Sequence, residues 1–157
     1  MKKLTSKSHR VLSGFLLNNL KKYFRLVELN YEKMHKSYSH ELNHPEDFRV
    51  KYRFYSKEEG GRKTLPFQGY RSDFWYNRLG NQSVSQLFMI WPEFEDENDH
   101  EVPAQGTAKM WILDPSMRDF HRETISVGLE GFFMEGPRRV AECEVIEIVG
   151  LMDNPRA

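Results

Sequence analysis

The stretch of residues 58–76, EEGGRKTLPFQGYRSDFWY, decides the fold that this sequence predicts. Its two consecutive glycines allow the backbone to take positive φ angles or to approach another segment closely, so they predict a tight turn. The residues from Tyr70 onward are rich in aromatic side chains, as is typical of a strand that packs on one face. A turn that leads into such a strand places two basic side chains, Arg62 and Lys63, at the rim of a sheet.

Apolar periodicity on both sides of this stretch predicts further strands. Residues 48–54 alternate apolar and basic side chains, which is the period-two pattern of a half-buried strand. The expected strands are 48–54, 70–76, 87–91 (ended by Pro92), 107–113, 124–131 and 138–149, with turns at Asp114-Pro115 and Glu135-Gly136-Pro137. Residues 93–101 carry six carboxylates and are expected to form a solvated acidic loop. Six short strands predict a mainly β fold, a closed antiparallel six-stranded barrel, because closure removes exposed strand edges.

The first 45 residues differ from the rest in pattern and in charge. Apolar residues from Val11 to Met34 recur in steps of three and four, which predicts one or two amphipathic helices that end before Pro45. Residues 1–45 carry nine Lys and Arg against three Asp and Glu, whereas residues 46–157 carry fourteen against twenty. We therefore expect a basic helical segment over 1–45, a barrel over 46–151 and a tail over 152–157. The apolar helix face is expected to pack on the rest of the protein, and the alternatives are a homodimer contact or a partner-binding face.

Composition places the chain among globular proteins. A chain of 157 residues with 39% hydrophobic and 29% charged residues can bury a core without disulfides or metal. No apolar run approaches the roughly 18 residues that a membrane span requires, and the short apolar run near the N-terminus lacks the features of a secretory signal. Cys143 is the only cysteine, which fits a structural thiol in a reducing compartment. These features predict a cytoplasmic protein.

One short motif has the letters of a zinc-protease signature. Residues 40–44 read HELNH, in which His40 and His44 would hold zinc and Glu41 would act on the bound water. Pro45 follows directly, so the second histidine falls at the very end of the predicted helix. A third ligand is also required, and no spacing recommends any of the remaining histidines or carboxylates. A coincidental match is the preferred interpretation, and we expect no metal and no other cofactor.

Two motifs at a fixed spacing carry a resemblance to a known family. The chain has Glu59-Gly60-Gly61-Arg62-Lys63-Thr64 and then Gly69-Tyr70-Arg71-Ser72-Asp73-Phe74-Trp75. Downstream it has Val102-Pro103-Ala104-Gln105-Gly106 and Gly136-Pro137-Arg138-Arg139-Val140. With these motifs, residues 48–151 resemble the third domain of bacterial elongation factor Tu, a six-stranded β-barrel. That family has EGGR before His-Thr-Pro, then Gly-Tyr-Arg-Pro-Gln-Phe-Tyr at the same spacing, a Met-Pro-Gly-Asp turn, and Gly-Gly-Arg-Thr-Val before the last strand.

The resemblance implies a barrel that is detached from the rest of that factor. The sequence holds no GxxxxGK[ST] loop, so GTP binding is not expected. In the family this domain contacts the T-arm backbone of aminoacyl-tRNA, which implies RNA contact for Arg62, with Lys63 in place of a histidine. Asp73 replaces a glutamine of the family and Asp114 replaces a lysine or histidine. Carboxylates at those two positions oppose the binding of phosphates.

These residues leave three functions to compare. We expect a non-catalytic module that binds a protein, with Arg62, Lys63, Arg71, Asp73 and Asp114 as the binding rim. The partner would be a bacterial protein that ordinarily meets elongation factor Tu, such as an exchange factor, a ribosome-associated protein or a toxin that this chain neutralises as an immunity protein. The first alternative is an RNA- or tRNA-binding protein that uses the basic rim residues and the basic N-terminal segment. The second alternative is a zinc hydrolase built on the HELNH motif.

Overall fold

The structure, a computed structural model, describes Lys21 and residues 35–76, 86–95 and 101–156. The chain divides into two compact units, Met1–His35 and Lys36–Ala157, and nearly all described residues belong to the second. Apart from Lys21, the helices predicted within residues 11–34 lie outside the described residues, as do residues 96–100 of the predicted acidic loop. In the described part of the chain, no helix has the length and apolar character needed to cross a membrane.

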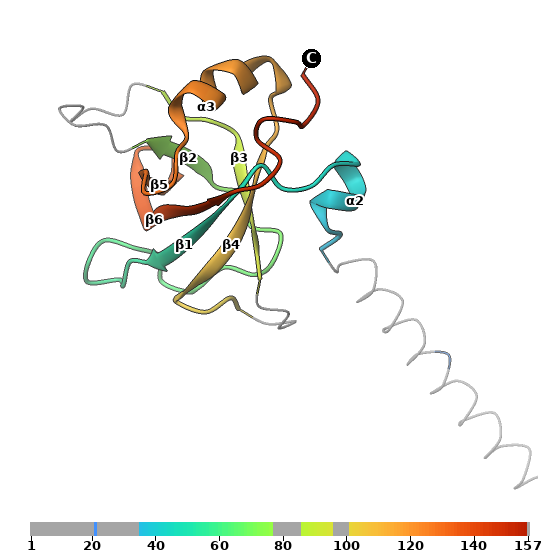
Figure 1. Cartoon of the computed structure of the whole chain (residues 1–157). Coiled ribbons are helices and arrows are strands. Elements are labelled where there is room, and N and C mark those ends of the chain that lie inside the picture. Colours follow the sequence, from blue (N-terminus) through green and yellow to red (C-terminus); the bar gives the residue numbers. More distant parts are fainter. Residues whose placement is uncertain (1–20, 22–34, 77–85, 96–100, 157) are drawn as a thin grey trace, which may run out of the picture. The chain divides into compact units, whose positions relative to one another are not determined.

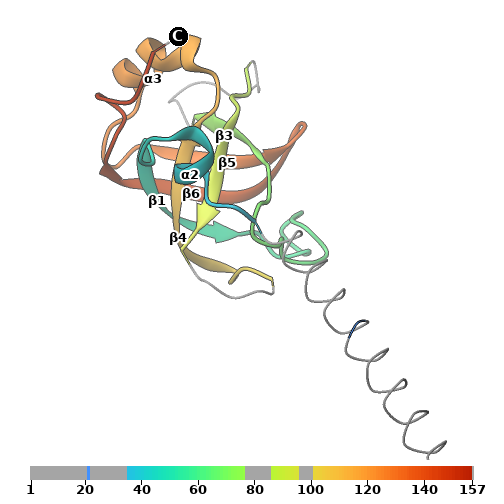
Figure 2. The ribbon, with the colours of Figure 1, turned by 90° about the vertical axis from the view of Figure 1, so that its right-hand side faces the viewer.

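Six antiparallel strands form one curled sheet in the second unit (Figures 1 and 2). The strands lie in the order β2-β5-β6-β1-β4-β3, and helix α3 covers one end of the sheet. The predicted mainly β fold with six antiparallel strands is therefore confirmed. The elements in chain order are α2 (Tyr38–Leu42), β1 (Phe48–Phe54), β2 (Asp73–Tyr76), β3 (Ile90–Phe94), β4 (Gln105–Ile112), η1 (Pro115–Met117), α3 (Arg118–Thr124), β5 (Glu130–Glu135) and β6 (Arg138–Ile148).

Strand β1 shows how an alternating sequence produces the two faces of the sheet. From Phe48 to Phe54 its apolar side chains are buried, whereas Arg49, Lys51 and Arg53 are exposed or half-buried on the outer face. The inward side chains of all six strands join one hydrophobic cluster inside the curl of the sheet. The prediction for residues 48–54 is confirmed, and β4 and β6 lie within two residues of their predicted ranges.

The two edge strands meet at one point without forming a continuous ladder, so the prediction of a closed barrel is wrong. In the described residues a single bridge joins β2 to the segment just before β3, with the Phe74 and Phe88 backbones exchanging hydrogen bonds of 2.8 and 3.0 Å. The Gln68 side-chain amide covers the other end of β3, because it donates to Phe94 O at 2.6 Å and accepts from Phe94 N at 2.9 Å. Between these points lies Pro92, which has no N–H to offer. One bridge, one side chain and one proline thus protect edges that closure would have removed.

Strand β3 lies three residues later than predicted and runs through Pro92. Glu95 N donates to Thr107 O of β4, so the odd-numbered residues of this segment bond to β4 and Pro92 faces the edge. A proline at that position removes no ladder hydrogen bond, and it therefore does not end the strand. Glu93, which was predicted to be in the acidic loop, is buried in β3, where its carboxylate accepts hydrogen bonds from Tyr38 N at 2.7 Å and Ser37 Oγ at 3.0 Å.

The strand predicted over residues 124–131 lies later in the chain, at Glu130–Glu135, so residues 124–129 are not part of it. The segment after β4 instead folds into η1 and α3, because Asp114 accepts a hydrogen bond from Ser116 N at 3.0 Å and Pro115 supplies the φ angle favoured at a first helical position. Gly128 then takes a φ of 86°, which turns the chain so that β5 begins only at Glu130. Local capping and turn formation therefore outweigh the apolar pattern of this segment.

Candidate functional site

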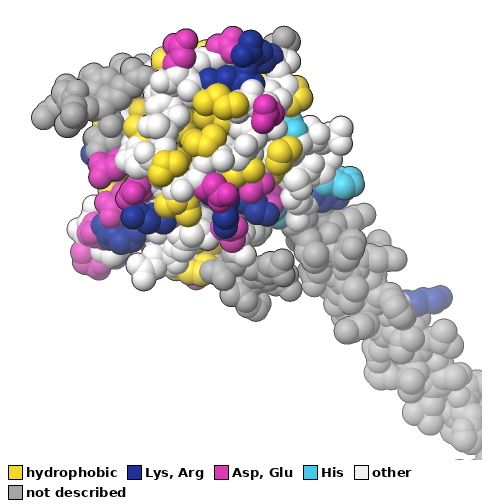
Figure 3. All heavy atoms as spheres, viewed as in Figure 1, with side chains coloured by type: hydrophobic (Ala, Val, Ile, Leu, Met, Phe, Trp, Pro, Cys, Tyr) yellow, Lys and Arg dark blue, Asp and Glu magenta, His cyan; other side chains and the backbone are white. Residues whose placement is uncertain are grey.

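The outer face of the sheet carries a ladder of oppositely charged pairs. Strand β1 supplies the bases and β6 the acids, with Lys51 in register with Glu144 and Arg53 in register with Glu142. Lys51 Nζ lies 2.7 Å from a Glu144 carboxylate oxygen, and Arg53 Nε donates to Glu142 at 2.8 Å. Figure 3 shows acidic and basic side chains lying side by side in a band across this part of the molecule. Exposed pairs of this kind add roughly 0.2–1 kcal/mol each, so their main effect is to set the pattern of surface charge.

The rows of this ladder continue onto aromatic side chains at the β2 side of the sheet. Glu142 is in register with Phe132 of β5, and Phe132 is in register with Trp75 of β2. The rings of Trp75 and Phe132 stack with their centroids 5.5 Å apart. The Arg139 guanidinium carbon lies 4.4 Å from the Trp75 centroid and 4.3 Å from the Phe132 centroid. We call Trp75, Phe132 and Arg139 the aromatic shelf, in which cation–π attraction holds the guanidinium over the rings.

A β-bulge places Arg139 on this face. The pairing of β6 with β5 passes directly from Ala141 to Arg139, so Val140 has no partner on β5. The extra residue reverses the alternation of side chains on one side of the bulge. Arg139 therefore shares the outer face with Glu142, while Val140 and Ala141 are both buried.

The ladder, together with Phe132 and Arg139 of the aromatic shelf, lines one wide groove of about 990 Å³, which we call the outer-face groove. Trp75 is buried and does not line it. A smaller hollow of about 410 Å³ continues from it toward the turn after β1. The two share Arg53, Tyr55 and Gln105 in their walls. The charged residues that line the outer-face groove are Lys51, Arg53, Arg139, Glu130, Glu142 and Glu144.

Two of the predicted rim residues, Arg62 and Lys63, come together in the smaller hollow. Arg62 pairs with Glu135 of β5, donates from Nε to Thr64 O at 3.1 Å, and lies 5.0 Å from the Tyr70 ring centroid. Lys63 is exposed and has no ion-pair partner among residues 35–76, 86–95 and 101–156. Arg62 is thus engaged within the protein, and of the two only Lys63 is open to a ligand.

Glu135 joins Arg62 to a small charged cluster at the β5–β6 hairpin. Burial raises the pKa of Glu135, but hydrogen bonds from Tyr70 and Arg138 and the charge of Arg62 lower the pKa overall. Tyr70 Oη donates to Glu135 at 2.8 Å, and burial together with this carboxylate raises the pKa of Tyr70. The cluster fixes the turn after β1 against the hairpin.

The other three predicted rim residues lie apart from this hollow. Arg71 stacks on Trp91, with its guanidinium carbon 4.5 Å from the ring centroid. Asp73 begins β2 in register with Met134. Asp114 caps η1, and hydrogen bonds from the Ser116 hydroxyl and backbone lower the pKa of Asp114. The fold therefore separates residues that the predicted rim would have joined.

The HELNH residues do not share one helical face. Helix α2 ends at Leu42, and Asn43 takes a left-handed φ of 56°, so His44 lies beyond the helix that carries His40. The His44 ring lies 5.5 Å from a Trp111 ring, and its Nδ1 donates to Pro45 O at 2.8 Å. Within the described ranges, no three His, Cys, Asp or Glu side chains are grouped as metal ligands would be.

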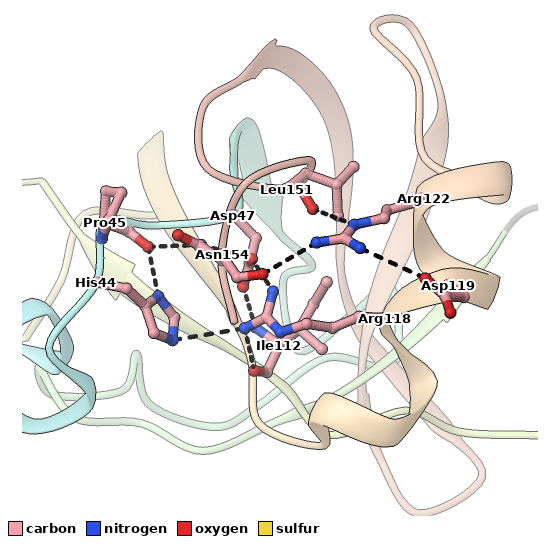
Figure 4. A network of polar contacts seen from close by, with 9 residues as sticks. All are labelled: His44, Pro45, Asp47, Ile112, Arg118, Asp119, Arg122, Leu151 and Asn154. Carbon is pink, nitrogen blue, oxygen red and sulfur yellow. Dashed lines mark hydrogen bonds and ion pairs between the residues drawn. The ribbon is translucent and has the colours of Figure 1, made fainter. Parts of the chain in front are cut away.

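A buried polar cluster joins α3 to the ends of β1 and β4 and to the C-terminal segment (Figure 4). The Asp47 carboxylate pairs with Arg118 and accepts hydrogen bonds from Ile112 N at 2.7 Å and Asn154 Nδ2 at 2.8 Å. Arg122 donates to Asn154 O at 3.0 Å. Because Asp47, Arg118 and Asn154 are all buried, these contacts support the fold.

Sequence reasoning missed Arg139 and the two β6 glutamates as surface-forming residues. Their arrangement depends on the bulge and on which strands become neighbours. One signal was present, since Val140-Ala141 places two apolar residues in succession just before the alternating run 141–145. No family model matches this chain, and a search of curated proteins finds no match either. The resemblance to the elongation factor Tu domain therefore rests on the sequence motifs alone.

Proposed function

We propose that this chain is a non-catalytic module that binds a protein partner through the outer-face groove. The observation that carries the proposal is the composition of that groove, in which arginine and aromatic side chains lie beside charges of both signs. Tyrosine, tryptophan, phenylalanine and arginine are enriched at protein interfaces. Charged side chains that ion pairs hold in place favour a partner whose charges are complementary, and they contribute more to specificity than to affinity.

The same groove is a poor surface for a nucleic-acid backbone. RNA binding draws much of its affinity from phosphates that are neutralised by lysine and arginine. In the outer-face groove, Lys51 and Arg53 are already paired with Glu144 and Glu142. A polyanion would have to displace or approach these carboxylates, whereas a protein can offer both signs of charge.

The motifs shared with the third domain of elongation factor Tu support one class of partner. A module of this shape would engage a protein that ordinarily meets that factor, such as an exchange factor, a ribosome-associated protein or a toxin directed at translation. This assignment rests on the sequence motifs, and the groove supports only the recognition of a protein.

Capture of a partner by the full-length chain, with a groove variant and a matched control, tests the proposal. Gln105 is exposed and lies in the wall shared by the groove and the smaller hollow, so Gln105→Trp fills both. Glu123→Trp makes a bulky change on exposed α3, away from the groove. We expect wild type and Glu123→Trp to retain one protein at stoichiometric yield from bacterial lysate, and Gln105→Trp to lose it. Absence of a stoichiometric partner, or equal capture by Gln105→Trp, contradicts the proposal.

RNA binding is a second candidate, favoured by the smaller hollow. Lys57 and Lys63 line it, both are exposed, and neither has an ion-pair partner among the described residues. On this alternative, tRNA affinity is salt-dependent and falls when both lysines are changed to glutamate. A filter-binding measurement at low salt decides it, since absence of binding where electrostatic attraction is strongest rules the alternative out.

A further inference from the structure

We propose that Arg139 is the residue of the outer-face groove that binds a carboxylate of the partner, a single acidic side chain flanked by neutral or basic residues of that protein. This inference rests on the proposed protein-binding function and names the chemistry that the groove recognises. It is carried by the guanidinium of Arg139, which is held in place by two rings and has no acidic partner of its own among the described residues.

Arg139 differs in this respect from its neighbours. Most arginines of the described chain hold carboxylates. The arginines in ion pairs are Arg49, Arg53, Arg62, Arg118, Arg122, Arg138 and Arg156. Arg139 is exposed, its guanidinium contacts the faces of Trp75 and Phe132, and its side chain forms no hydrogen bond or ion pair with a described residue. Its planar set of N–H donors therefore faces the groove without a fixed acceptor.

The nearest carboxylates of the fold are committed elsewhere. Glu142, on the same face of β6, accepts from Arg53 Nε at 2.8 Å and from Tyr55 Oη at 3.3 Å. Glu135 is shared by Arg62 and Arg138. Asp73 is separated from Arg139 by Met134, since the pairing of β2, β5 and β6 places these three residues in one row. Among the described residues, these carboxylates leave Arg139 without an acidic partner, so we assign that partner to another molecule.

The surroundings select a single carboxylate over a polyanion. An arginine that stacks on aromatic faces loses little conformational freedom when it binds. Two parallel N–H donors of its guanidinium, the guanidinium fork, match the two oxygens of a carboxylate. Phosphate matches the same fork. However, Glu130, Glu142 and Glu144 also line the groove, and they would repel the successive charges of a nucleic-acid backbone. An acidic side chain flanked by neutral or basic residues avoids that repulsion, and such a segment is a feature of a protein.

A titration followed at the Arg139 side chain tests this assignment directly. The probes are an acetylated, amidated pentapeptide Gly-Gly-Glu-Gly-Gly, its glutamine counterpart and inorganic phosphate, each added to the full chain to millimolar concentration. The readout is the Nε–Hε resonance of Arg139 in a nitrogen–proton correlation spectrum. We expect a saturable shift with the glutamate peptide and none with the glutamine peptide. Equal responses to the two peptides, no response to either, or saturation by phosphate at lower concentration than by the glutamate peptide would overturn the assignment.

Variants separate this inference from the proposed function. Arg139→Gln removes the charge, Arg139→Lys keeps the charge but loses the fork and the stack, and Arg138→Gln is the matched control outside the groove lining. We expect Arg139→Gln to lower affinity for a captured partner roughly 10- to 100-fold, as for loss of one charged hydrogen-bonded contact, and Arg139→Lys to restore it only in part. Arg138→Gln should bind as wild type does. A partner that is lost from Gln105→Trp but bound fully by Arg139→Gln refutes the role of Arg139 and leaves the groove's function standing, whereas failure to capture any partner refutes the function itself.

Discussion

Replacing Asp47 with asparagine tests whether the buried cluster at the α3 end of the sheet holds the fold together. The substitution keeps the shape of the side chain but removes its charge and one of its acceptor oxygens. Those oxygens pair with Arg118 and accept from Ile112 N at 2.7 Å and Asn154 Nδ2 at 2.8 Å. After the change Arg118 is a buried cation without a counter-charge, and one N–H donor faces the new amide group.

The expected cost is large compared with the stability of a domain of this size. Removing one partner of a buried ion pair costs roughly 3–5 kcal/mol, whereas a whole domain is stable by roughly 5–15 kcal/mol. Arg118→Met should cost about as much, because it leaves the Asp47 charge buried and unpaired. The double variant removes both charges, so its loss of stability should be smaller than the sum of the two single losses by roughly 2 kcal/mol or more.

Urea unfolding followed by far-UV circular dichroism measures these differences. With a urea dependence near 2 kcal/mol per M, a loss of ~4 kcal/mol lowers the unfolding midpoint by roughly 2 M. Asp119→Asn is the matched control, because this carboxylate is 68% exposed and pairs with Arg122 and Arg156 at the surface. Its midpoint should move little, since exposed pairs contribute roughly 0–1 kcal/mol. A midpoint for Asp47→Asn within the range of the control, or single losses that simply add in the double variant, would refute the reasoning.

Three further predictions concern the core. Burial lowers the pKa of His121 to about 4 from 6.5, so the native state binds fewer protons than the unfolded state between these pH values. The free energy of unfolding should therefore fall by about 2 kcal/mol as the pH drops from 7.5 to 5. Chemical denaturation at a series of pH values measures this, and a His121→Gln variant whose stability changes with pH by the same amount would contradict the prediction. Gly131→Ala should destabilise the protein by roughly 1–3 kcal/mol in thermal unfolding, because its Cβ would lie 2.3 Å from Phe74 Cζ; an unchanged melting temperature would show that the ring can move away. Burial raises the pKa of the Cys143 thiol, so labelling by a disulfide reagent should track global unfolding, and native protein that reacts as fast as a free thiol would disprove its protection.

The proposed binding surface is built from side chains that come from four strands. Lys51 and Glu144 belong to β1 and β6, Phe132 to β5 and Gln105 to β4. Each of these residues points outward because an inward neighbour is apolar, so the same alternation that builds the core also builds the groove. A module of this kind can change its partner by changing outward residues without loss of the fold.

The local pattern of the chain was sufficient to predict several elements of this protein. Strand β1 follows from strict alternation over residues 48–54, and β6 lies close to the range predicted after the turn at Glu135-Gly136-Pro137. Arg62 and Lys63, which were predicted to lie at a rim, both line the smaller hollow, and their role in binding stays a prediction. The strand expected over residues 124–131 begins only at Glu130, because helix capping by Asp114 and a turn at Gly128 outweighed a weak apolar pattern.

Only the tertiary structure decided how the sheet ends and what its outer face displays. Whether the barrel closes depends on the pairing of Phe74 with Phe88 and on the reach of Gln68 to Phe94, contacts between residues that no local period relates. The face on which Arg139 lies depends on one unpaired residue in β6, because adding a residue to a strand moves the side chains beyond it to the opposite face. Periodicity is a property of each strand by itself, whereas register and edge contacts are set by the neighbours that folding supplies.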